Sequence, residues 1–115
     1  MASFVDAIST PGELDIFPVE FIGQVDYTIS ALGSSTAGGT LADPIVGVFD
    51  SAGNLLAYQD DSWALGSDPM LQFTAPVSGI YYIGVADAIG STGTYTLVYD
   101  QTLPPPVVDT STFLF

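Results

Sequence analysis

Hydrophobic positions along this chain recur at every second residue within short runs. The run 24–32 is the clearest case, with Val25, Tyr27, Ile29 and Ala31 on one face and Asp26, Thr28 and Ser30 on the other. No window places apolar residues at helical spacing over three turns, so the period of two indicates half-buried strands. We predict strands over residues 15–22, 24–32, 44–49, 55–59, 69–74, 80–85 and 94–99.

The loops between these runs are rich in glycine and proline, which is typical of antiparallel sheets joined by tight turns. We therefore predict an all-β fold, a single β-sandwich of about seven to nine mostly antiparallel strands with jelly-roll or Greek-key connections. A length of 115 residues fits one domain. The expected parts are an N-terminal extension over residues 1–12, the sandwich over residues 13–101, and a proline-rich tether with an apolar tail over residues 102–115.

The stretch 41–61 predicts a β-hairpin with carboxylates at its open end. Residues 50–54, Asp-Ser-Ala-Gly-Asn, supply the turn, since Asp favours the first turn position and Gly permits a positive φ. In an antiparallel hairpin the start of one strand lies beside the end of the other, so Asp43 is expected beside Asp60 and Asp61. Carboxylates this close repel one another unless protons or a cation intervene, and Ca²⁺ is the usual hard cation for oxygen ligands.

Two further acids are candidate ligands of the same ion. Asp68 follows the loop after the hairpin, and Asp15 opens the first predicted strand. The predicted metal site therefore comprises Asp43, Asp60, Asp61, Asp68 and Asp15, with Ca²⁺ as the cofactor. The alternative is that these aspartates are solvated and only cap turns, which Asp commonly does in loops.

The charge balance excludes several functions. The chain has 13 acidic residues and no Lys, Arg or His, which gives a net charge of −13. Binding to nucleic acid or to anionic lipid through phosphate contacts needs Lys or Arg. A catalytic triad, a thiolate, a Schiff base and the usual zinc site need His, Cys or Lys, which are all missing. We therefore predict that the protein is not an enzyme, does not bind nucleic acid and, without about 20 consecutive apolar residues, does not insert into a membrane.

Three segments in order, TLADPIVGVFDSAGNLLAYQDDS, DPMLQFTAPVSGIYYIGV and GSTGTYTLVYD, carry a family resemblance. They resemble the bacterial pre-peptidase C-terminal domain, whose pattern has a DP strand start, a D-x-x-G-N turn, an acidic exit, an FTAPxSGxYYI strand pair and a closing GTYTL strand. Residues 13–32 are similar to its opening segment. The resemblance implies a calcium-associated β-sandwich of secreted bacterial proteins, typically an accessory to an enzyme. This chain departs from the family in lacking basic surface residues.

The loop after the hairpin contains Trp63, the only tryptophan, beside the predicted acidic cluster. Its indole either caps the core or is exposed as a platform for a sugar or a partner protein. Trp63 is therefore the candidate ligand-binding residue, with polysaccharide as one expected ligand.

Both ends of the chain carry apolar side chains that are candidates for assembly: Phe4, Val5 and Ile8 at the start, and Phe113, Leu114 and Phe115 behind the prolines. Such segments suit donation to the sheet edge of a neighbouring subunit. The final residues also resemble the C-terminal signals of type I secretion substrates, which indicates export by a type I-like route.

The sequence thus supports two hypotheses for a non-catalytic extracellular or cell-surface protein. In the first, the chain is a calcium-stabilised structural subunit that forms a homo-oligomer or polymer, a filament or surface layer, through its terminal segments. In the second, it is a secreted accessory or adhesion module that binds polysaccharide or a partner protein.

Overall fold

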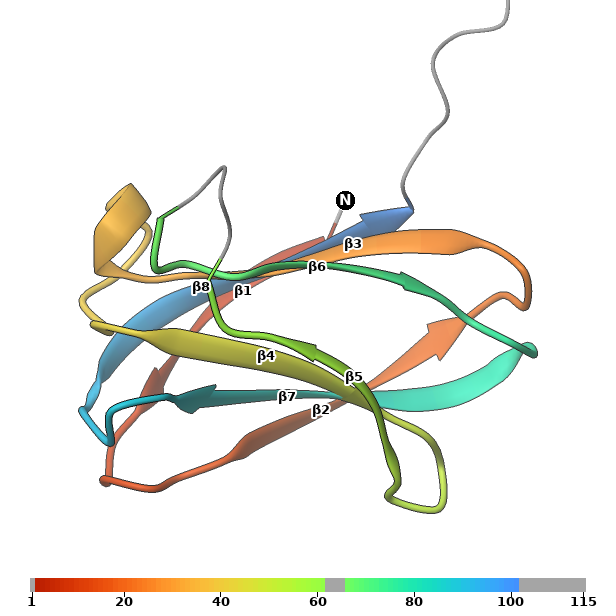
Figure 1. The fold of residues 1–115 in the computed structure, drawn as a ribbon, viewed down its shortest axis with the longest axis horizontal. Coiled ribbons are helices and arrows are strands. Elements are labelled where there is room, and N and C mark those ends of the chain that lie inside the picture. The colour runs from red at the N-terminus through yellow and green to blue at the C-terminus, as the bar shows by residue number, and fades with distance from the viewer. Residues whose placement is uncertain (1, 62–65, 102–115) are drawn as a thin grey trace, which may run out of the picture.

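Two four-stranded antiparallel sheets pack face to face in the computed structural model, which describes residues 2–61 and 66–101 (Figure 1). One sheet has the strand order β1-β8-β3-β6 and the other β2-β7-β4-β5. The strands are β1 (Ala2–Ile8), β2 (Asp15–Phe21), β3 (Asp26–Leu32), β4 (Pro44–Phe49), β5 (Leu55–Gln59), β6 (Met70–Thr74), β7 (Gly79–Asp87) and β8 (Gly93–Gln101). A short 3₁₀ helix, η1 (Ser34–Thr36), follows β3. The predicted all-β sandwich is confirmed.

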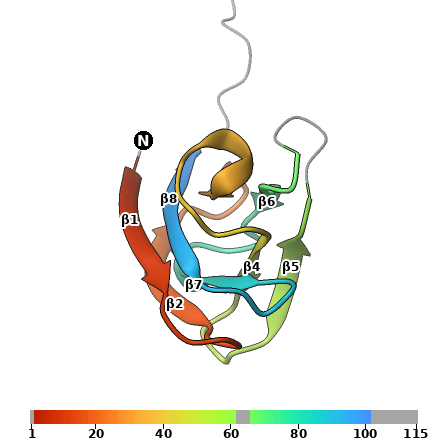
Figure 2. The same cartoon turned by 90° about the vertical axis from the view of Figure 1, so that its left-hand side faces the viewer.

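Consecutive strands alternate between the two sheets, and among the described strands only the connection from β4 to β5 stays within one sheet. Seen end-on, β1 and β2 lie on one side of the sandwich and β6 and β5 on the other (Figure 2). Most ladders therefore join strands that are distant in sequence, and the β4–β5 hairpin is the one local element of the fold.

The core fills the space between the sheets with the inward-facing residues of both. Four aromatic rings pack together toward one end of it, where β2 ends and β3 begins. Phe21 stacks on Tyr27 and Tyr81 at centroid distances of 4.1 and 5.5 Å, and Phe73 meets Tyr81 edge-on at 5.9 Å. The hydroxyls of the two tyrosines are hydrogen-bonded: Tyr81 donates to the carbonyl oxygen of Val77 at 2.6 Å, and Tyr27 accepts from the backbone N–H of Ile22 at 2.8 Å. A core of this kind holds both sheets at a fixed separation and so fixes the loops at their ends.

The observed strands agree closely with the predicted runs. The bounds of β4 and β5 match the prediction residue for residue. Strand β2 lies at a sheet edge, because it pairs only with β7, and Pro18 within it suits that position. Strand β7, whose residues 80–85 are largely apolar, lies inside its sheet between β2 and β4.

Residues 2–8 differ from the prediction, because they form strand β1 of the sandwich and not an extension outside it. β1 pairs along its whole length with β8. The side chain of Ile8 is 1% exposed in the core, and the ring of Phe4 packs against Phe17 at 4.8 Å. Two of the three N-terminal residues predicted for assembly thus serve the chain's own core, whereas Val5 is exposed. The C-terminal candidates, residues 113–115, lie outside the described residues.

Replacing Ile8 with Ala should lower the free energy of unfolding by about 2–5 kcal/mol, because buried methyl groups are lost and a cavity remains. Val5→Ala is the matched control on the same strand. Its side chain is 69% exposed, so the change should stay within about 0.5 kcal/mol. Urea unfolding followed by circular dichroism measures both. Equal, small effects would contradict the placement of residues 2–8 in the core.

Candidate metal site

The open end of the β4–β5 hairpin gathers three carboxylates. Asp43 directly precedes β4, and Asp60 and Asp61 directly follow β5. Val46 pairs with Gln59 across the hairpin, so the two acidic ends meet. One carboxylate oxygen from each of the three aspartates lies within 4.8 Å of the other two. The structure thus brings together three of the five residues predicted as metal ligands.

Two of these carboxylates have an oxygen that lacks a hydrogen-bond donor. The side chains of Asp43 and Asp60 are half-buried, and that of Asp61 is exposed. The Oδ1 atoms of Asp43 and Asp60 are buried and have no hydrogen-bond partner in the described part of the chain. A buried oxygen without a partner is costly, and such atoms in a native fold call for a water, a proton or an ion.

The surroundings of Asp43 disfavour its charged form. Burial above all, then the negative charge and hydrogen bonding of Asp60 and the charges of Asp61 and Asp87, together raise the pKa of this carboxyl to about 6. Without a cation, a proton therefore stays on Asp43 up to mildly acidic pH. A divalent cation would displace that proton, because metal ligands must be deprotonated.

Asp87 fixes the backbone beside the group. It lies at the end of β7 opposite Pro44, and its Oδ2 accepts hydrogen bonds from the backbone N–H of Asp43 at 3.1 Å and from the hydroxyl of Ser91 at 2.7 Å. Burial alone would raise the pKa of Asp87, but these bonds and one from Ile89 lower it overall. Asp87 also orders its own loop, because its Oδ1 accepts hydrogen bonds from the backbone N–H groups of Ile89 and Ser91. Its role beside Asp43 follows from the β4–β7 ladder, for which the sequence carries no local signal.

Asp68 is fully buried and lies outside the group of three. Its Oδ2 accepts hydrogen bonds from the backbone N–H and the hydroxyl of Thr36, at 3.0 and 2.7 Å, which attaches η1 to the loop before β6. Its Oδ1 has no partner among the described residues. Asp68 therefore holds residues 34–36 in place through its hydrogen bonds with Thr36.

Asp15 also lies apart from the group, at the start of β2. Its Oδ2 accepts a hydrogen bond of 2.6 Å from the hydroxyl of the fully buried Tyr95. Burial and a hydrogen bond with Glu13 raise the pKa of Asp15 to about 6, whereas that same bond lowers the pKa of Glu13. Asp15 therefore holds its proton to a higher pH than Glu13 does. Trp63, the predicted ligand-binding residue, lies outside the described residues.

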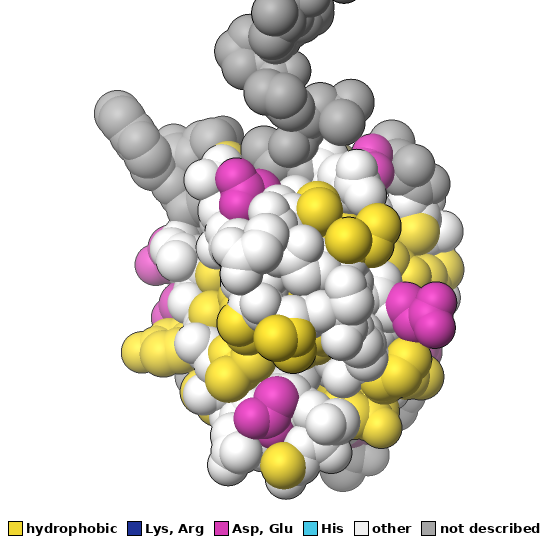
Figure 3. All heavy atoms as spheres, turned by 90° about the vertical axis from the view of Figure 1, so that its right-hand side faces the viewer, with side chains coloured by type: hydrophobic (Ala, Val, Ile, Leu, Met, Phe, Trp, Pro, Cys, Tyr) yellow, Lys and Arg dark blue, Asp and Glu magenta, His cyan; other side chains and the backbone are white. Residues whose placement is uncertain are grey.

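Three carboxylates in a chain without basic side chains can hold a hard divalent cation. Ca²⁺ takes about six to eight oxygen ligands, so backbone carbonyls and water would complete its shell. At the other end of the molecule, where the β4–β5 turn lies, acidic side chains stand apart among apolar and uncharged ones (Figure 3). Among the described residues, three carboxylates converge at the open end of the hairpin, where the donor set fits calcium.

The chain is thus an antiparallel β-sandwich module with a group of three acids at one end of a hairpin. The profile of the bacterial pre-peptidase C-terminal domain family matches residues 15–87, and the chain belongs to this family. Domains of this family are non-catalytic accessory domains of peptidases and occur in secreted bacterial proteins. Within the described residues there is no helix of the length and apolarity needed to span a membrane.

A solved structure with the same fold is the pre-peptidase C-terminal domain of a collagenase from Bacillus anthracis. It is similar with a TM-score of 0.66 and 19% sequence identity, over 86% of this chain and 88% of that one. A comparison with curated proteins found no match.

In calcium-free buffer, stability should fall as the pH rises from about 4 to about 6. The folded-state pKa values of Asp15 and Asp43, about 6, exceed the ordinary value of 3.8. Folding therefore takes up protons in this window, and the stability that they supply is complete below pH about 4 and lost above about 6. Asp15→Asn and Asp43→Asn should each flatten this slope, measured by denaturant unfolding across the pH range.

Adding Ca²⁺ should distinguish the contribution of Asp43 to the pH dependence of stability from that of Asp15. Saturating Ca²⁺ should remove the effect of Asp43→Asn on the slope, because the metal favours the charged carboxylate, and should leave that of Asp15→Asn unchanged. If Ca²⁺ changes both effects alike, the separation of Asp15 from the acidic group is wrong.

Proposed function

We propose that this chain is a non-catalytic extracellular accessory module whose sandwich is stabilised by Ca²⁺ bound at Asp43, Asp60 and Asp61. The observation that carries the proposal is the pair of buried, unpartnered Oδ1 atoms of Asp43 and Asp60 within this group of three acids. No Lys, Arg or His exists in the chain to neutralise them. A cation satisfies both oxygens and removes the repulsion in one step.

The position of the group explains why a bound cation would stabilise the fold. Strand β5 lies at a sheet edge and pairs only with β4. Asp43 belongs to the β4 end of the hairpin and Asp60 to the β5 end. Without a cation, repulsion between them pushes β5 from its only partner, whereas a shared cation ties the two strand ends together.

The composition of the group favours weak binding, which suits an extracellular protein. Asp61 is exposed and only three carboxylates converge among the described residues, so water completes much of the coordination shell. Calcium sites of extracellular modules typically have dissociation constants of about 10⁻⁴–10⁻³ M. The family's occurrence in secreted bacterial proteins supports the same location.

Calcium should raise the melting temperature. At a free concentration a hundredfold above Kd, binding to the folded state adds about 2.7 kcal/mol, which corresponds to about 10 °C or more for a domain of this size. Asp60→Asn combined with Asp61→Asn should abolish the response, measured by differential scanning calorimetry with Ca²⁺ and with chelator.

The matched control is Asp6→Asn combined with Asp26→Asn, which removes the same charge from two exposed strand positions. This variant should keep the full calcium response. A melting curve of the unaltered protein that is the same in Ca²⁺ and in chelator would refute the metal site.

We also propose a second function, self-association into a homo-oligomer or polymer. The observation that favours it is an apolar, carboxylate-free hollow on the outer face of the β2-β7-β4-β5 sheet, in a chain whose segment 102–115 is rich in Pro, Val, Phe and Leu. Because β1 is part of the fold, the assembly segment in this proposal is 102–115 alone.

Self-association should appear as a rise in average mass with protein concentration, in sedimentation of the full chain with millimolar Ca²⁺. Calcium should promote it, since neighbours of charge −13 repel over about a Debye length, roughly 8 Å at physiological salt. A monomer at every concentration would contradict self-association and leave the calcium-binding accessory module intact.

A further inference from the structure

A pair of glycines lies at the centre of the outer face of the β2-β7-β4-β5 sheet. Gly47 of β4 pairs directly with Gly84 of β7. Across the sheet, Ile16 of β2 is the next residue on one side and Tyr58 of β5 the next on the other. The middle of this row thus has no side chains, whereas both flanks have large ones.

Backbone geometry does not demand glycine at either position, because neither belongs to the residues with positive φ. Glycine inside a strand weakens it and often marks a place where another chain or a ligand approaches the backbone. A Cβ on Gly84 would lie 2.8 Å from the ring of Phe49, and one on Gly47 would lie 3.1 Å from the side chain of Leu55. The glycines therefore let these side chains lie low on the sheet, which leaves a depression between them.

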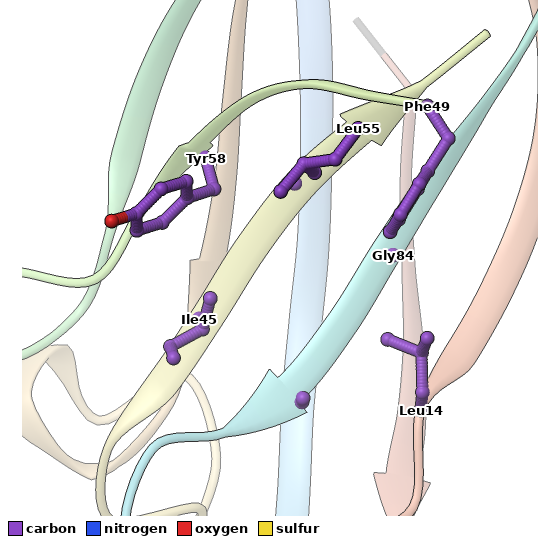
Figure 4. Close-up of a pocket in the computed structure, with 8 residues that line it drawn as sticks. Leu14, Ile45, Phe49, Leu55, Tyr58 and Gly84 are labelled. Atoms are coloured by element: carbon purple, nitrogen blue, oxygen red, sulfur yellow. The ribbon is translucent and has the colours of Figure 1, made fainter. Parts of the chain in front are cut away.

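The depression is an apolar groove with no charged lining residue. Its deeper part, of about 230 Å³, lies among Leu14, Ile45, Phe49, Leu55, Tyr58 and Gly84 (Figure 4). A second part, of about 440 Å³, shares Leu14 and Phe49 and extends to the β4–β5 turn. The walls are unusually exposed for apolar side chains, with Leu55 at 51% and Tyr58 at 63%.

We propose that this groove is the docking site for the segment 102–115 of a second copy of the chain. The inference rests on the self-association proposed above and names the surface that accepts the segment. An open, elongated groove on a sheet suits an extended peptide, whereas small-molecule pockets are mostly more enclosed. Aromatic-lined grooves in particular accept proline-rich segments, which are extended before they bind.

The chemistry of the segment matches that of the groove. Residues 102–108, Thr-Leu-Pro-Pro-Pro-Val-Val, carry no charge, and Phe-Leu-Phe stands at 113–115. Asp109 is the one acidic side chain of the segment. In a chain with 13 acids, residues 102–108 and the groove both lack carboxylates, so this part of the contact forms without the repulsion that opposes other contacts between copies. Burial of Pro, Val and aromatic side chains against Tyr58 and Leu55 supplies the affinity, at about 25 cal/mol per Å² of apolar surface.

The direction of the chain favours a second copy over the segment's own groove. The segment follows β8, which belongs to the sheet opposite the one that bears the groove (Figure 1). To reach its own groove it would have to turn around a sheet edge directly after Gln101. Three consecutive prolines at 104–106 favour an extended chain and oppose such a turn.

The test uses a fluorescent peptide of residues 102–115 and the full-length protein at concentrations where it is monomeric. Anisotropy should show binding to the unaltered protein, and a scrambled peptide should not bind. Tyr58→Ser should weaken binding at least about tenfold, as expected when a central aromatic contact is lost. Ile89→Ser is the control, since Ile89 is 69% exposed, lies in the loop between β7 and β8 and does not line the groove. Melting curves establish that both variants fold.

The possible outcomes distinguish a failure of the groove as the docking site from a failure of self-association as such. Unchanged peptide binding by Tyr58→Ser overturns the groove as the docking site, even where sedimentation shows that the full chain associates. No peptide binding by a protein that also sediments as a monomer at all concentrations overturns both. Loss of peptide binding and of association in Tyr58→Ser, with both kept in Ile89→Ser, supports the groove.

Discussion

The absence of every basic side chain decides how this sandwich is held together. Each carboxylate must accept hydrogen bonds from N–H or O–H groups, since no ion pair with a side chain is possible. Asp50 closes the β4–β5 turn on the N–H groups of Ala52 and Asn54, and Asp68 attaches η1 through Thr36. The aspartates thus fasten loops onto the core. The hairpin end with Asp43 differs, because three acids converge there and the buried Oδ1 atoms of Asp43 and Asp60 have no hydrogen-bond partner among the described residues. This makes it the candidate site.

How much of the fold can be predicted depends on how local each contact is. The β4–β5 hairpin was predicted with its correct bounds because both strands and the turn over residues 50–54 are adjacent in sequence. β1 was missed because its partner, β8, lies at the far end of the described chain. Pro11 and Gly12 mark a turn into β2, and the sequence does not distinguish such a turn from a domain boundary.

The same reasoning explains the site. The hairpin pattern alone places Asp43 beside Asp60 and Asp61, so proximity could be predicted without knowing the fold. Asp68 and Asp15 take their partners from Thr36 and Tyr95, which the packing of separate strands brings to them. The sequence gives only an ambiguous sign of the groove, namely a glycine within each of two predicted strands. Such a glycine indicates either a β-bulge or a place where another chain approaches the backbone. Only the β4–β7 register shows that two such glycines meet.

The candidate metal site and the groove share one hairpin, which couples them physically. Leu55 and Tyr58, which form one wall of the groove, belong to β5, and β5 is held to the sheet by β4 alone. The end of β5 is the point where Asp60 meets Asp43. The proposed cation, by joining these carboxylates, would also keep the wall of the groove in place, and repulsion in its absence would loosen the same strand. Calcium would then promote association in two ways, by reducing charge between copies and by ordering the surface on which they meet.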